Sequence, residues 1–225
     1  MGHKQAAIFG DKFKWKRDYT DETAKRRLQN IVYPIAELAG LEIAPPDGKK
    51  KLLCPHTLHA VQMIYRQHSR IWKFPYEKKH DHITITIRES WRNKHRNSNR
   101  AEWEKFKVWA EERGEKVVVL EDQEENPISI KDRWDLYQCK MNLMVNNGPA
   151  LMLILSDAPY IIMGYPGNAH DVYLLSVHHW LWRNAQYPWA NKNQRLVWKK
   201  DTFEAISRCY LAIEAGGVSK ERPAG

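Results

Sequence analysis

Hydrophobic and polar positions follow two different periods along the chain, and the change lies near residue 80. Before it, leucine, isoleucine and valine recur every three or four positions over residues 21–38, which is typical of one face of a helix. Pro34 lies inside this pattern and is expected to kink the helix. After the change, short apolar segments alternate with longer amphipathic ones. The first part of the chain is therefore predicted to be mostly helical, and the second part to alternate strands with helices.

The second part is predicted to form a parallel sheet. Strands that alternate with helices build β–α–β units, whose crossovers are right-handed. The segment 82–87 places three isoleucines on one face, and the continuous apolar segment 116–120 is typical of a central parallel strand. The predicted strands are His82–Ile87, Lys116–Leu120, Met141–Val145 and Tyr160–Met163, and the predicted helices are Asn99–Arg113, Ser129–Lys140, Pro149–Ser156 and Asp201–Ala215.

The first part contains too few strands for a complete α/β domain. Its predicted elements after the first helix are short strands at 41–44 and 52–54 and a helix at 56–68. It could be the remainder of an α/β domain or a helical addition to the second part. We therefore predict a partial or accessory region over residues 1–78, a Rossmann-like domain over 79–216 and a flexible tail over 217–225.

Composition restricts the classes of partner. The 225 residues include 36 Lys and Arg against 27 Asp and Glu, for a formal charge of +9. Nucleic acid, a membrane surface and a phosphorylated small molecule all fit this charge, as does a solvated basic face without a partner. No segment approaches the roughly 18 apolar residues of a membrane span, and the N-terminus has no signal-peptide core. We expect a cytoplasmic protein with reduced cysteines, and peripheral contact with a membrane surface stays open.

Parallel α/β sheets bind ligands at the carboxyl ends of their strands. The most informative strand end is the turn Asn146-Asn147-Gly148-Pro149, which precedes a predicted helix. Gly148 permits close backbone approach, and Pro149 suits the first helical position. The free N–H groups of the first helical turn would then form a site for a diphosphate. The alternative is an Asx-type turn without a ligand.

Charged residues follow the first two predicted strands, 82–87 and 116–120, on this edge. Arg88 can form a forked pair with a phosphate. Asp122 could accept a hydrogen bond from a sugar or base hydroxyl, or it could cap a helix or pair with an arginine. The segment 91–100 contains four Lys or Arg residues and no acid, so it could bind a donor, face nucleic acid or be solvated. Its place above the sheet edge favours donor binding.

Metal and cofactor motifs are absent from the sequence. The pairs His80/His82 and His56/His59 lack a third ligand at a suitable spacing. There is no Walker A motif, no GxGxxG and no GxSxG. We therefore expect no resident metal and no cofactor.

Several segments resemble glycosyltransferases of the GT-B class. Residues 133–153 (RWDLYQCKMNLMVNNGPALML) resemble the nucleotide-sugar site of these enzymes, including heptosyltransferase-like members. Residues 85–89 (ITIRE), 96–99 (RNSN) and 117–122 (VVVLED) are similar to a group of bacterial glycosyltransferases. They also resemble, more distantly, the fucosyltransferase pattern in which a strand-end arginine grips the donor diphosphate. The resemblance covers about residues 79–203.

The resemblance implies the C-terminal half of a GT-B fold and metal-independent transfer of a hexosyl, fucosyl or heptosyl group to a glycan, lipid or protein acceptor. Two departures from the class concern the first domain, which is short here and often carries the catalytic base in inverting members. Glu89 is the carboxylate that we nominate as general base. The alternatives are a basic nucleic-acid-binding protein and a catalytically inactive nucleotide-binding module. The donor residues implied are Arg88, Arg96, Asn97, Asn99, Asp122, Asn146, Asn147, Gly148 and Pro149, with Asp122 near the base or ribose.

Overall fold

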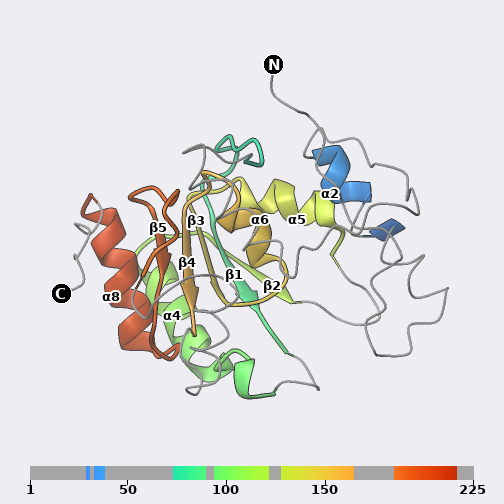
Figure 1. The fold of residues 1–225 in the computed structure, drawn as a ribbon. Coiled ribbons are helices and arrows are strands. Elements are labelled where there is room, and N and C mark those ends of the chain that lie inside the picture. The colour runs from blue at the N-terminus through green and yellow to red at the C-terminus, as the bar shows by residue number, and fades with distance from the viewer. Residues whose placement is uncertain are drawn as a thin grey trace. The chain divides into compact units, whose positions relative to one another are not determined.

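The computed structural model describes residues 29–30, 33–38, 73–89, 94–121, 128–164 and 185–216 (Figure 1). The chain divides into two compact units, Met1–Leu53 with Ile128–Asp135, and Cys54–Pro127 with Leu136–Gly225. The first unit contains helix α2 (Tyr33–Leu38) and most of helix α5 (Ile130–Tyr137). The elements predicted at 41–44, 52–54 and 56–68 lie outside the described residues.

The second unit contains a sheet of five strands, all of them parallel, which confirms the predicted α/β class. The strands are β1 (Ile83–Ile87), β2 (Val117–Glu121), β3 (Met141–Val145), β4 (Tyr160–Met163) and β5 (Gln194–Leu196). Their order in the sheet is β2-β1-β3-β4-β5. In register, Ile85 lies opposite Val119 of β2 and Leu143 of β3, and Ile161 of β4 lies opposite Leu143 and Arg195.

Helices cover the sheet on both sides (Figure 1). Helices α4 (Arg100–Glu112) and α8 (Phe203–Glu214) pack on the face that carries the isoleucines of β1, and the rings of Phe106 and Tyr210 meet edge to face at 5.7 Å. The short helix α6 (Ala150–Ile154) lies on the other side of the sheet. The core between the sheet and helices α4 and α8 contains Ile83, Ile85, Ile87, Trp103, Phe106, Ala110, Met141, Leu143, Val145, Ile161, Met163, Ile206, Tyr210 and Ile213.

The opposite face of β1 carries buried polar groups that are hydrogen-bonded. Thr84 Oγ1 donates to Asn142 Oδ1 at 2.8 Å, and the hydroxyls of Thr86 and Tyr137 lie 3.1 Å apart. Asn142 Nδ2 in turn donates to the backbone oxygens of Tyr137 and Pro159, both at 3.0 Å. A buried polar group without a partner would cost about 1–3 kcal/mol, so these bonds are what allow threonine and asparagine in central strands.

The predicted place of β2 and the predicted ends of several helices are wrong; α5 ends at Tyr137 instead of Lys140, and α8 begins at Phe203 instead of Asp201. β2 is an edge strand of the described sheet and not a central one, and Val119 on it is exposed. A run of β-branched residues favours a parallel strand, but it does not specify the strand's place in the sheet. α6 ends at Ile154 instead of Ser156, because the Ser156 hydroxyl donates to Leu153 O and accepts from Ala158 N, which turns the chain.

Candidate functional site

The strand order places a topological switch point between β1 and β3. The chain leaves β1 towards β2 on one side, whereas β3, β4 and β5 follow on the other. Ligands of open parallel sheets bind outside the carboxyl ends of the two strands at such a point. Arg88 directly follows β1, and Asn146 directly follows β3. The structure thus brings together two strand ends that the sequence singled out.

The loop after β1 folds back over the end of its own strand. Arg88 N donates to Ser98 Oγ at 2.8 Å, and Ser98 N donates to Arg88 O at 3.0 Å. Between them lies a short 3-10 helix, η2 (Lys94–Arg96). The guanidinium of Arg88 donates through Nη1 to Asn97 Oδ1 at 3.4 Å. This loop therefore brings Arg96 and Asn97 to the end of β1.

Arg96 joins this loop to the end of β3. Its Nη2 donates to the backbone oxygen of Asn146 at 3.3 Å. Arg88 is partly buried, and its pKa is lowered by this burial and by the like charge of Arg96. Two guanidinium groups that repel each other at a strand edge form a site at which an anion is favoured.

The turn after β3 caps helix α6. Asn147 Oδ1 accepts a hydrogen bond from Ala150 N at 3.0 Å. This N–H group, which the sequence predicts to bind a diphosphate, therefore donates to a side chain of the protein instead. Pro149 takes the N-cap position, and α6 has 5 residues. A Cβ atom added at Gly148 would meet nothing within 4 Å. For Asn147 the structure favours the alternative of an Asx-type turn, in which the side chain bonds to the backbone. The positive charge at the switch point comes from Arg88 and Arg96 and not from the start of α6.

Glu89, the nominated base, pairs with the first residue of α4. Arg100 Nε donates to Glu89 Oε1 at 3.0 Å, and Arg100 Nη1 donates to Glu121 Oε1 at 2.6 Å. These two carboxylates raise the pKa of Arg100. Glu89 is exposed and would have to leave Arg100 in order to accept a proton. Asp122, which follows Glu121, lies outside the described residues.

Asn99 joins the loop to helix α4. It takes the N-cap position, and its backbone oxygen accepts from Glu102 N and Trp103 N at 2.9 and 3.1 Å. Its side chain makes no capping hydrogen bond. Its own N–H donates to Asp201 Oδ2 at 2.7 Å. Sequence reasoning missed this role of Asp201, because its position just before α8 indicates only the start of that helix.

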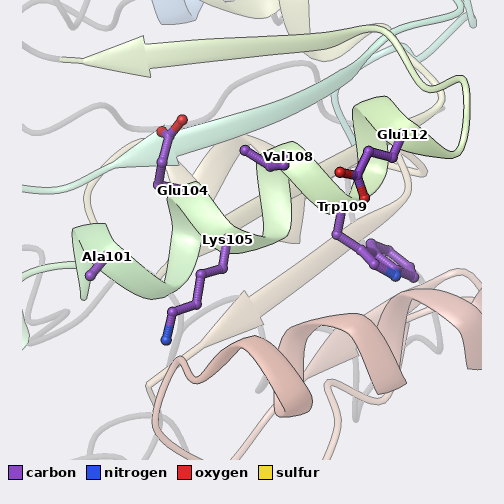
Figure 2. A pocket seen from close by; sticks show the side chains of 6 residues that line it. All are labelled: Ala101, Glu104, Lys105, Val108, Trp109 and Glu112. Carbon is purple, nitrogen blue, oxygen red and sulfur yellow. The ribbon is translucent and has the colours of Figure 1, made fainter.

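A shallow hollow of about 480 Å³ lies elsewhere, along one side of α4 (Figure 2). Side chains of one helix line it, and no strand end contributes. It therefore lacks the convergence of elements that marks the switch point. Its lining residues are Ala101, Glu104, Lys105, Val108, Trp109 and Glu112.

No family model, curated protein or solved structure matches the chain. The fold and the site alone therefore define its class, an α/β protein with paired arginines at the switch point of a parallel sheet. Among the residues that the structure describes, no group of three or more His, Cys, Asp and Glu side chains could hold a metal ion. None of the described helices is long and apolar enough to cross a bilayer.

Proposed function

We propose that the chain transfers a sugar from a nucleotide-diphosphate donor to a glycan, lipid or protein acceptor, without an obligatory metal. The observation that carries this proposal is that the loop after β1 brings Arg96, which bonds to Asn146 O, and Asn97, which bonds to Arg88, to the switch point between β1 and β3. Charge develops on the diphosphate as it leaves the sugar. Fixed cations at that place lower the barrier, as a divalent metal does in metal-dependent enzymes.

In this proposal the two guanidinium groups hold the diphosphate through forked hydrogen bonds. The Asn97 amide, next to Arg88, and the end of β3 at Asn146 border the same place. Asp122 would bind the ribose or base, and Glu89 would accept the proton of the acceptor hydroxyl. Asn147 would contribute through α6, which it caps, and Asn99 through the start of α4.

One observation favours a second candidate, a nucleotide-binding module without catalysis. Glu89 Oε1 accepts from Arg100 Nε at 3.0 Å, and this ion pair holds the carboxylate at the start of α4. In that case the arginines would bind a nucleotide and no sugar would be transferred.

Calorimetric titration with ADP, GDP and UDP tests the binding half of the proposal. We expect one of them to bind, and Arg88→Ala or Arg96→Ala to weaken it by about ten- to a hundredfold, the value of a charged hydrogen bond. Arg208→Ala is the matched control, because Arg208 is an exposed arginine on α8. No response to any nucleotide, combined with salt-sensitive binding of DNA or RNA, would instead indicate a nucleic-acid-binding protein.

Release of nucleoside diphosphate from the matching nucleotide sugar then separates the two candidates. The expected result is slow release into water, with Glu89→Gln lowering turnover by about a hundredfold and leaving donor affinity unchanged. Glu121→Gln is the matched control, since Glu121 is the other carboxylate on Arg100. Binding without release would leave the nucleotide-binding module.

A further inference from the structure

Asp201 connects the segment before α8 to the start of α4. Its Oδ2 accepts two hydrogen bonds, from Asn99 N at 2.7 Å and from Trp103 Nε1 at 2.8 Å. Trp103 is 1% exposed and belongs to the hydrophobic core, so it holds the carboxylate in place. Hydrogen bonds to an ionised acceptor are stronger than those between neutral groups.

The other donor is the backbone N–H of Asn99, the last residue of the loop that carries Arg96. Ser98 and Asn97 of this loop bond to Arg88, Arg96 bonds to Asn146 O, and Asn99 bonds to Asp201 through its N–H and to the first turn of α4 through its oxygen. The first link joins the loop only to its own strand. The second consists of a side chain that must also face the anion. The bond to Asp201 ties the backbone of the loop to the segment before α8 and uses no group that must face the anion.

We propose that Asp201 is a positioning residue for the anion site, acting through Asn99 to hold Arg96 and Asn97 beside Arg88. This inference rests on the proposed function. A ligand binds the fraction of molecules in which its groups are already in place, so a loop that spends most of its time elsewhere weakens the apparent affinity in proportion. Asp201 itself does not touch the ligand.

Glu102 provides a matched control, a residue that links α4 to α8. Glu102 Oε2 accepts from Phe203 N at 2.9 Å, so an acid on α4 holds the start of α8 in the reverse direction. Glu102→Ala breaks this link and leaves the loop bonds in place. Asp201→Asn keeps an acceptor oxygen on a side chain of the same length, so it should restore part of what Asp201→Ala loses.

The experiment measures the affinity for inorganic pyrophosphate and the amide hydrogen exchange of residues 94–99 without ligand. We expect Asp201→Ala to weaken pyrophosphate binding about tenfold and to speed exchange in this loop. Glu102→Ala should stay within about twofold of the wild type in both measurements, and Asp201→Asn should lie between.

Two outcomes would overturn the inference, and they are distinct. Wild-type affinity and unchanged exchange in Asp201→Ala would remove the positioning role and leave the anion site standing. Equal losses in Asp201→Ala and Glu102→Ala would reduce Asp201 to a structural link between α4 and α8. Failure of the wild-type protein to bind pyrophosphate would instead remove the anion site and the proposed function with it.

Discussion

Cys139 is fully buried just before β3, beside the polar groups on the face of the sheet opposite the isoleucines of β1. Its Sγ donates to Met141 O at 3.3 Å and to Asn142 Oδ1 at 3.5 Å. Burial raises the pKa of the Cys139 thiol from 9.0 to about 11, because a thiolate in this place would lose its hydration. The folded protein therefore holds the thiol proton more tightly than the unfolded chain does.

This difference predicts a loss of stability in alkali. The stabilisation is fully present below pH 9 and is lost as the pH rises through the window from 9 to about 11. Over this window we expect the free energy of unfolding in urea to fall by about 2–3 kcal/mol through this group. Cys139→Ala should flatten that part of the pH profile. An equally steep decline in the variant would assign the loss to other groups.

Single residues of the site were predictable to different degrees. Arg88 and Asn146 were found because each directly follows a strand that the apolar pattern locates, and parallel strands end at one edge. The pairing of Glu89 with Arg100 and the link from Asn99 to Asp201 were not found. The partners in such contacts are set by the packing of elements far apart in sequence, which a local period does not contain.

At the scale of elements, Asn147 can be tested as the cap of α6. Asn147→Ala removes the acceptor of the Ala150 N–H and should cost about 1 kcal/mol in urea unfolding. Asn147→Asp keeps an acceptor there and should retain the stability, yet it places a negative charge one residue from Asn146, whose backbone oxygen accepts from Arg96, and should weaken pyrophosphate binding severalfold. If Asn147→Ala unfolds like the wild type while losing pyrophosphate affinity, the side chain serves the ligand and not the helix.

Elements buried on both faces were the most predictable ones. β3 and β4 have the predicted bounds, and β1 begins one residue later than predicted, at Ile83. β5 was not predicted, because Gln194–Leu196 is short and has a polar residue at two of its three positions. The place of β2 at the sheet edge was also missed. Strand order depends on how crossovers pack, and the hydrophobic period of a strand is the same wherever it lies.

At the scale of the whole molecule, strand order selects one place on a basic protein. The charge of +9 is spread along the sequence and does not by itself define a site. The order β2-β1-β3-β4-β5 creates a single reversal among the described strands, at β1 and β3, where Arg88 follows β1 and Arg96 bonds to Asn146 O at the end of β3. If the switch point binds the anion, only cations at β1 and β3 should matter; if the overall charge binds it, any cation should matter equally. A cation elsewhere on the same edge of the sheet can separate these two possibilities.

Lys199 is such a cation. It is exposed after β5, where its backbone oxygen accepts from Gly164 N at 3.0 Å. β5 lies three strands from β1, roughly 14 Å at the usual strand spacing, which exceeds the screening length of about 8 Å in physiological salt. Lys199→Ala should therefore leave the pyrophosphate dissociation constant within about twofold of the wild type at this salt, whereas Arg88→Ala should raise it at least tenfold.

Binding of a DNA oligonucleotide, which depends on overall charge, is the control. Both variants should lose the same amount of affinity for it, with the same dependence on salt. Equal losses of pyrophosphate affinity in both variants would show that a diffuse field, and not the switch point, binds the anion.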